Sequence, residues 1–178
     1  SGLDHLLFVF ALMLVVRSTR QLVLAVTAFT LAHSITLALA TLDIIHVPGP
    51  PVEAIIALSI VFVAQEVIQR QQGHAGLASR KPWLVAFAFG LLHGLGFAGA
   101  LAEVGLPHNA IPLALLFFNI GVELGQLAFI AAVLGVTALL RRLWRGAATP
   151  RWAIPLQAYL IGGVASFWLI ERIVGFWA

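Results

Sequence analysis

Six long apolar stretches, separated by short polar breaks, dominate the pattern of hydrophobic and polar positions along this chain. A helix needs about 20 residues to cross a bilayer. On that basis we expect transmembrane helices near residues 3–16, 22–42, 52–68, 83–104, 111–140 and 153–176. Each break is too short for a soluble domain and is rich in proline, glycine or charged residues. The pattern predicts an all-α integral membrane protein, a bundle of about six transmembrane helices forming one domain over residues 1–178.

Composition supports the membrane class. Hydrophobic residues make up 61% of the 178 residues and charged residues 10%, whereas a typical soluble domain has about 25% charged residues. A formal net charge of +3 would fit nucleic-acid binding, but the basic residues concentrate in loops, which membrane orientation explains. We therefore expect the lipid bilayer as a partner and no nucleic acid. The chain has no cysteine, so it has no thiolate ligand and no thiol nucleophile.

The basic residues fall in alternate loops. Arginine and lysine occur in the first, third and fifth breaks and are missing from the second and fourth. By the positive-inside rule the odd-numbered loops are cytoplasmic, so both termini are extracytoplasmic, and we expect a bacterial inner (plasma) membrane. Because Ser1 directly precedes an apolar run, we also expect an extracytoplasmic N-terminal domain ahead of it. Arg172 is off the pattern, and we expect it to snorkel outward or to pair with Glu171 or Asp4.

Ionisable side chains lie inside several of the apolar stretches. Such a residue costs about 2.5–3.5 kcal/mol at the centre of a membrane helix, so it usually pairs, binds an ion or takes part in chemistry. At about 1.5 Å of rise per residue, these residues fall in one layer in the outer half of the bundle. Imidazole and carboxylate groups, in a chain without cysteine, suit a borderline or hard metal ion bound through nitrogen and oxygen. We therefore predict a divalent metal site whose ligands are Asp4, His5, His33, Glu53, His93 and Glu123.

Three further polar residues are predicted to support these ligands. Asn119 and Gln126 share one helix face with Glu123, and we expect them to orient ligands or bound water. Ser34, next to His33, is expected to assist by hydrogen bonding. A serine in that position also commonly bonds to its own helix backbone.

Each of these residues also has a purely structural interpretation. A buried histidine can serve as a hydrogen-bonding partner between helices. Asp4 and His5 could mark an interfacial helix end, and Glu53 could be a first-turn acid favoured by the helix dipole. Glu66 lies at a cytoplasmic helix end with Arg70 four residues later, which predicts a surface ion pair.

Two local patterns concern helix packing. Glycines around the second buried histidine give a smooth surface where a neighbouring helix or a substrate can approach the backbone closely; they are Gly90, Gly94, Gly96 and Gly99. In addition, residues 29–33 overlay residues 89–93 at a shift of 60 positions. The overlay predicts a parallel repeat of two helix pairs, with His33 and His93 at related positions.

Five ordered motifs carry these polar residues: Gly2–Phe8, Phe29–Leu37, Pro51–Ser59, Phe89–Ala98 and Phe118–Gln126. Together they resemble the HupE/UreJ family of membrane proteins over nearly the whole chain. Members are associated with hydrogenase and urease accessory functions, and the family is commonly described as nickel or cobalt permeases. The resemblance therefore implies divalent metal transport. The chain resembles the membrane part of a longer form of the family, in which an extracytoplasmic region precedes the Asp-His-Leu-Leu-Phe motif.

Three functions remain open on the sequence. A permease or uptake accessory protein would replace the hydration shell of a divalent cation with imidazoles and carboxylates. An intramembrane metal-dependent hydrolase of zinc type would hold a water on the same ion, with Glu123 or Asp4 as general base against a lipid or peptide bond. A metal sensor or chaperone would bind without flux. The sequence favours transport over enzymatic activity.

Overall fold

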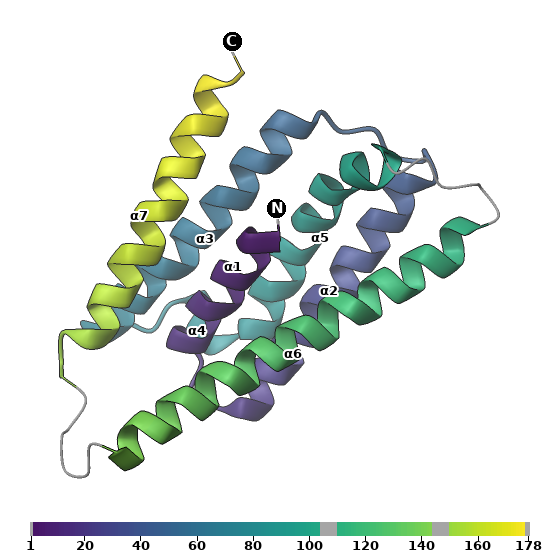
Figure 1. The fold of residues 1–178 in the computed structure, drawn as a ribbon. Helices are drawn as coiled ribbons and strands as arrows, with labels where there is room; N and C mark the ends of the chain where they lie inside the picture. Colours follow the sequence, from purple (N-terminus) through teal and green to yellow (C-terminus); the bar gives the residue numbers. More distant parts are fainter. Residues whose placement is uncertain (1, 104–109, 144–149, 177–178) are drawn as a thin grey trace.

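The computed structural model describes residues 2–103, 110–143 and 150–176, and the regular elements in these ranges are all helical (Figure 1). The helices are α1 (Gly2–Val15), α2 (Thr19–Thr41), α3 (Gly49–Gln71), α4 (Leu77–Arg80), α5 (Pro82–Glu103), α6 (Ile111–Leu143) and α7 (Ala153–Val174). Each of the six predicted stretches corresponds to one long helix, and the last residue predicted for the fourth stretch lies outside the described residues. The all-α prediction is confirmed, while the short α4 was not predicted.

Four helices are long and apolar enough to cross a membrane: α2, α3, α6 and α7. The apolar helix α1 and the apolar part of α5, Pro82–Phe97, are shorter. An integral membrane protein is therefore supported, and the count of six spans stays a prediction.

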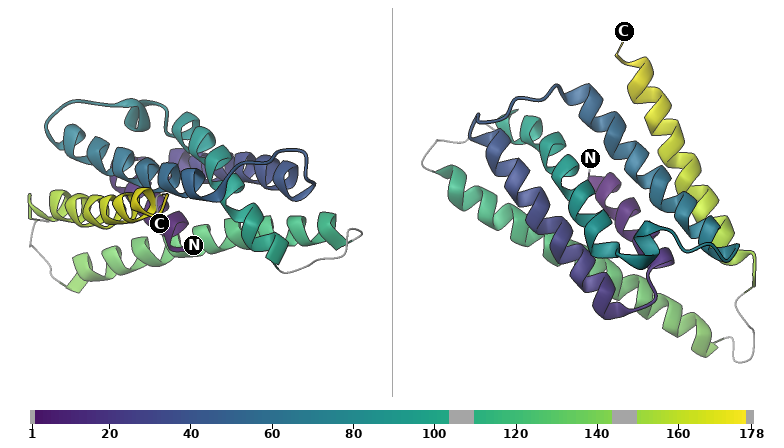
Figure 2. Two further views of the ribbon diagram at one scale, coloured as in Figure 1. Left: turned by 90° about the horizontal axis from the view of Figure 1, so that it is seen from above. Right: turned by 180° about the vertical axis from the view of Figure 1, so that it is seen from behind.

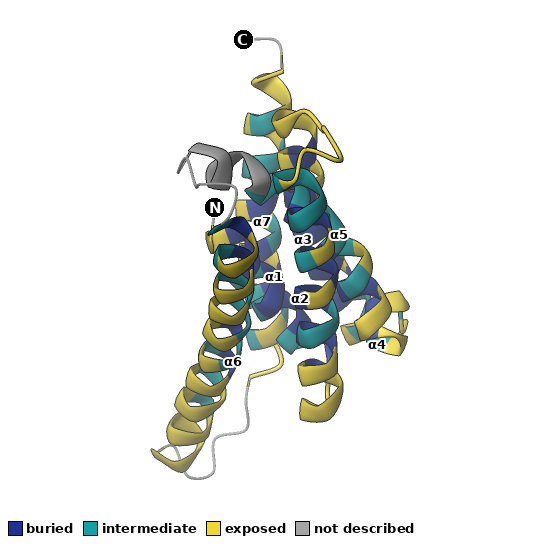
Figure 3. Cartoon of the chain, turned by 90° about the vertical axis from the view of Figure 1, so that its right-hand side faces the viewer, coloured by how far each residue is buried: buried dark blue, intermediate teal, exposed yellow. Residues whose placement is uncertain are grey.

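The helices pack around α1 and α5 near the centre of the bundle. Helices α2, α5, α3 and α7 follow one another side by side, and α6 crosses in front of them, touching α2 and α1 (Figures 1 and 2). Buried side chains from each of the described helices form the main core, and its fully buried members include Phe8, Leu12, Phe29, Ile60 and Val63. Most of the outer surface of α6 and α7 is exposed and apolar (Figure 3), as expected for helices that face lipid.

The two ends of the bundle differ in charge. The start of α1 and the end of α7 lie toward one end, as the contact between Arg172 and Asp4 shows (Figure 1). At the other end Arg17 and Arg70 line a common groove, and the Arg70 guanidinium donates a hydrogen bond to the Val15 carbonyl. The first and third loops thus share one end, which agrees with the charge pattern. Which end faces the cytoplasm stays a prediction.

The prediction of a surface ion pair between Glu66 and Arg70 is wrong. This glutamate is buried, at 4% exposure, and accepts a hydrogen bond from the Ala78 backbone N–H at 2.8 Å. A Cβ atom at Gly76 would collide with its carboxylate. Glu66 therefore fixes α4 against α3, a role that helix spacing alone does not reveal.

Helices α2 and α5 approach closely through glycine, as the sequence predicted. A Cβ atom on Gly90 would collide with the Phe29 carbonyl oxygen, and one on Gly94 would collide with Thr36 and with the His33 backbone. A Cβ atom on Gly96 would meet the Cδ1 atom of Ile56 on α3, the end of a side chain and not a backbone atom. The surroundings of Gly99 lie outside the described residues. Glycine thus allows the backbones of α2 and α5 to touch.

The neighbours of these helices agree with a parallel repeat. Helices α2 and α5 run in the same direction (Figure 1), and their contacts advance together from Phe29 with Gly90 to His33 with Gly94. Helix α6 packs against α2, and α3 packs against α5, so each helix of the central pair contacts the second helix of the other pair. Superposition of the two helix pairs stays a prediction.

We expect Gly94→Ala to destabilise the protein, because the new methyl group must push α2 away from α5. Overpacking of this kind costs about 1–3 kcal/mol. Gly121→Ala is the matched control: it is also a helical glycine, but a Cβ there meets no atom within 4 Å. Thermal unfolding in detergent, followed by circular dichroism, should show a lower Tm for Gly94→Ala alone. An unchanged Tm would contradict the close contact.

Candidate functional site

Three histidines from three helices meet in the interior. His5 on α1 lies 5.2 Å from His33 on α2 and 4.9 Å from His93 on α5, measured between ring centroids. Both ring pairs are edge to face. His33 and His93 are fully buried, and His5 is 6% exposed. We call His5, His33 and His93 the histidine triad. The contact between α2 and α5 positions two members, and α1 brings the third between them.

Phenylalanine rings enclose the histidine triad. Phe29 contacts all three imidazoles, with centroid distances of 5.4, 6.1 and 5.0 Å to His5, His33 and His93. Phe97 lies 5.1 Å from His5 and 5.7 Å from His33. These apolar walls keep bulk water from the imidazoles and lower the local dielectric. A polar interaction formed inside them is correspondingly strong.

Three buried ring nitrogens lack hydrogen-bond partners in the described part of the chain. They are both nitrogens of His33 and the Nδ1 atom of His93. Leaving a buried polar group unsatisfied costs about 1–3 kcal/mol, and native structures contain few such groups. The unpartnered nitrogens therefore call for an explanation beyond helix packing.

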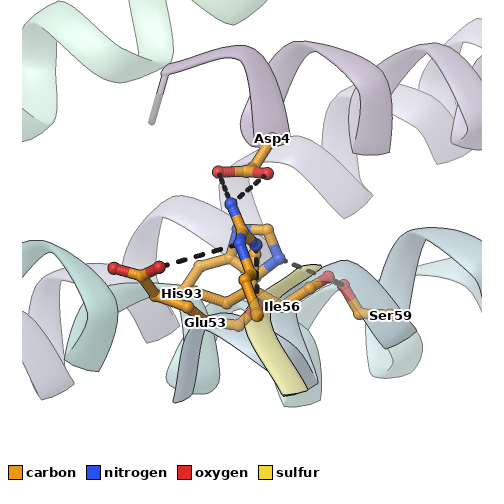
Figure 4. A network of polar contacts seen from close by, with 6 residues as sticks. Asp4, Glu53, Ile56, Ser59 and His93 are labelled. Atoms are coloured by element: carbon orange, nitrogen blue, oxygen red, sulfur yellow. Dashed lines mark hydrogen bonds and ion pairs between the residues drawn. The ribbon is translucent and has the colours of Figure 1, made fainter. Parts of the chain in front are cut away.

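The Nε2 atom of His93 does have a partner, Ser59 on α3 (Figure 4). The Ser59 hydroxyl donates its hydrogen bond to the Ile56 carbonyl at 2.6 Å. A hydroxyl has one proton and two lone pairs, so its oxygen accepts from the His93 Nε2–H across 3.2 Å. This arrangement puts the imidazole proton on Nε2 and leaves Nδ1 with a lone pair. A histidine binds a metal ion through such a lone pair, and it usually donates the N–H of its other ring nitrogen to a hydrogen-bond acceptor, as His93 does to Ser59.

Two of the predicted carboxylates, those of Asp4 and Glu53, contact Arg172 (Figure 4). The Nη2 atom of Arg172 donates to both carboxylate oxygens of Asp4, at 3.1 and 3.2 Å. Its Nε lies 3.7 Å from a carboxylate oxygen of Glu53. The pairing of Arg172 with Asp4 is one of the alternatives that the sequence predicted.

The third predicted carboxylate and its amide neighbour contact α2. Glu123 on α6 accepts a hydrogen bond from the Thr27 hydroxyl at 2.9 Å. Gln126 is 2% exposed, and its Oε1 lies 3.4 Å from the Thr30 hydroxyl. These contacts join α6 to α2 beside the triad.

Ser34 and Asn119 bond to their own helices. The Ser34 hydroxyl donates to the Thr30 carbonyl at 2.6 Å, and the Asn119 amide donates to the Leu115 carbonyl at 2.8 Å. For Ser34, the sequence allowed either a hydrogen bond that assists the ligands or one to its own helix backbone, and the structure shows the second. The Asn119 carbonyl oxygen is buried and has no hydrogen-bond partner among the described residues, so it keeps an acceptor for a ligand or a water.

By these contacts the six predicted ligands fall into three groups: the histidine triad, the Asp4 and Glu53 pair on Arg172, and Glu123. Within the described ranges, no set of three histidine, aspartate or glutamate side chains has an arrangement that would hold a metal ion. The single layer of six ligands expected from helix depth therefore differs from the structure. Depth gave the height of each residue but not its direction around the helix axis.

A cavity of about 710 Å³ opens beside the triad, between α1 and α6. His5 and Gln126 are its polar lining residues, and Phe97 and Phe118 separate it from His33. Its remaining lining is apolar or glycine. The cavity gives an apolar molecule access to one edge of the triad.

Sequence reasoning missed three residues of this site: Ser59, Thr27 and Thr30. Each is a small hydroxyl residue in an apolar helix, which commonly bonds to its own backbone. Thr30 and Ser59 each lie within one of the five motifs, and this was the available signal. Its role becomes visible once α3 is placed beside α5.

A family model described as HupE / UreJ protein matches residues 1–172. No curated protein and no solved structure gives a significant match.

Ser59→Ala should change the tautomer of His93, because the substitution removes the acceptor for Nε2–H. Nitrogen-15 NMR of histidine-labelled protein in detergent should show the Nε2–H form of His93 in the wild type and lose that preference in the variant. Ser79→Ala, which removes a hydroxyl bonded to Gly76 near α4, is the control. An Nδ1–H form in the wild type would contradict the assignment.

Proposed function

The chain belongs to the HupE/UreJ family, which is associated with nickel or cobalt uptake or with urease accessory function, and on that basis we propose that it is a divalent transition-metal permease or uptake accessory protein. In this proposal the metal is the cargo and the histidine triad is its intramembrane binding site. We place the protein in a bacterial inner membrane with both termini outside. Nickel or cobalt is the expected ion, and zinc is compatible with the same ligands.

The observation that carries this proposal is the burial of ring nitrogens without partners. His33 is fully buried and has no hydrogen bond on either ring nitrogen among the described residues. A packing histidine would normally satisfy at least one of them. An arriving divalent cation would give both His33 and the Nδ1 atom of His93 a partner.

Binding in this site requires a small rearrangement. The imidazoles now stack edge to face, whereas metal binding requires their nitrogens to point at one position about 2.0–2.1 Å away. Rotation about the side-chain bonds of His5 and His33 would provide this, while Ser59 continues to hold His93. In this proposal the side-chain amides of Asn119 and Gln126 orient a bound water.

The carboxylates act at separate steps in this scheme. Asp4 and Glu53 lie at the end of the bundle where α1 begins and α7 ends, so they would attract the cation first. Glu123 lies on α6 beside Thr27 and would help to compensate the charge of the ion in the interior. The imidazoles then replace water ligands, which the phenylalanine walls exclude.

The apolar cavity favours a second candidate function, an intramembrane metal-dependent hydrolase. An acyl chain could lie in the cavity with a bond to be cleaved near His5. Because Arg172 holds Asp4, Glu123 is the better general base for this chemistry. Metal flux without hydrolysis supports the permease, and hydrolysis of a lipid without flux supports the enzyme.

We expect His33→Ala and His93→Ala to lower metal affinity by at least about tenfold, since changes outside the ligand shell already cost that much. The matched control is His74→Ala, which removes an exposed loop histidine. Metal content by mass spectrometry after nickel or cobalt loading measures binding, and uptake into proteoliposomes measures transport. Equal loss in His74→Ala, or full metal content in both triad variants, would contradict the proposed site.

A further inference from the structure

Arg172 makes more contacts than a residue that simply reaches out to water. Besides Asp4 and the Glu53 carboxylate, its Nη1 donates to the Glu53 backbone carbonyl at 2.7 Å. The guanidinium carbon also lies 5.8 Å from the centre of the Trp168 ring, one turn earlier on α7. The side chains of Arg172 and Asp4 are 16% and 3% exposed, whereas that of Glu53 is 53% exposed. Arg172 therefore joins α7 to α1 and α3 at a partly buried position.

We propose that Arg172 is a tethered cation that occupies the Asp4 and Glu53 carboxylates until a divalent metal ion displaces it. The inference rests on the proposed function and adds that Arg172 competes with the metal ion for these carboxylates. Asp4 directly precedes His5, so an ion bound between Asp4 and Glu53 is next to the triad. Release of Arg172 is then the step that opens the path from these carboxylates to the imidazoles.

The charges of the groups support the exchange. Asp4 and Glu53 together carry two formal negative charges, and Arg172 supplies one positive charge. A divalent ion in place of the guanidinium would set two positive charges against the same carboxylates. The Coulomb attraction grows with the product of the charges, so these carboxylates attract a divalent ion more strongly than the guanidinium.

The position of Arg172 allows it to leave. It lies in the last turn of α7, and its side chain is long enough to turn toward the aqueous interface while its aliphatic part stays on the helix. The contact with Trp168 would be lost in that movement. Trp168 is thus a built-in reporter for displacement.

The test measures nickel or cobalt binding by equilibrium dialysis and tryptophan fluorescence on the same detergent-solubilised samples. Arg172→Gln removes the competing cation, and we expect its Kd for the metal to fall by about three- to tenfold. Arg20→Gln, an exposed arginine at the opposite end, makes the same charge change and should leave the Kd unchanged. Arg172→Lys keeps a positive charge without the guanidinium fork, so its Kd should lie between those of the wild type and Arg172→Gln. It also carries the test if Arg172→Gln folds poorly.

Fluorescence separates displacement from simple electrostatic repulsion. Metal should change the emission of the wild type, and this change should be missing from both Trp168→Phe and Arg172→Gln. Metal binding without a Trp168 signal, or an unchanged or weaker affinity in Arg172→Gln, would overturn the displacement proposal and leave the metal site standing. Failure of every variant and of the wild type to bind metal would overturn the metal site as well as the displacement.

Discussion

The contact between α2 and α5 is the interaction on which the rest of the structure depends. Gly90 and Gly94 allow the two backbones to touch, which places His33 and His93 in the same buried region. Helix α1 then adds His5, and α6 and α3 pack on the outer sides of the pair. A side chain at either glycine would separate the helices and with them the imidazoles. The packing of small residues and the candidate chemistry are therefore one structural feature.

The protein deals with polar groups in an apolar environment in two different ways. Glu66, Glu123 and Asp4 each have a hydrogen-bonding partner, from the α4 backbone, from Thr27 and from Arg172 respectively. The imidazole of His33 is fully buried, but neither of its nitrogens has a partner within the described residues. Residues that only stabilise the fold gain nothing from remaining unsatisfied. The contrast separates Glu66, a structural polar group, from His33, a candidate metal ligand.

Hydropathy and motif order predicted the helices and the residues of the site better than they predicted which of these residues lie together. The six long helices, the glycine contact and an Arg172–Asp4 pair follow from apolar length, small-residue spacing and charge position. The separation of Glu53 from the histidine triad does not, because helix depth says nothing about which side of α3 faces the bundle. Ser59 was missed for the same reason: its partner is 34 positions away, and only the packing of α3 on α5 brings them together.

X-ray absorption spectroscopy of the nickel- or cobalt-loaded protein tests the central claim most directly, because it reports the atoms bound to the ion. We expect a first shell at about 2.0–2.1 Å that contains imidazole nitrogen, with three histidine rings contributing their characteristic outer-shell scattering. A shell made of oxygen alone, with no imidazole signal, would contradict the assignment of the histidine triad as the metal site.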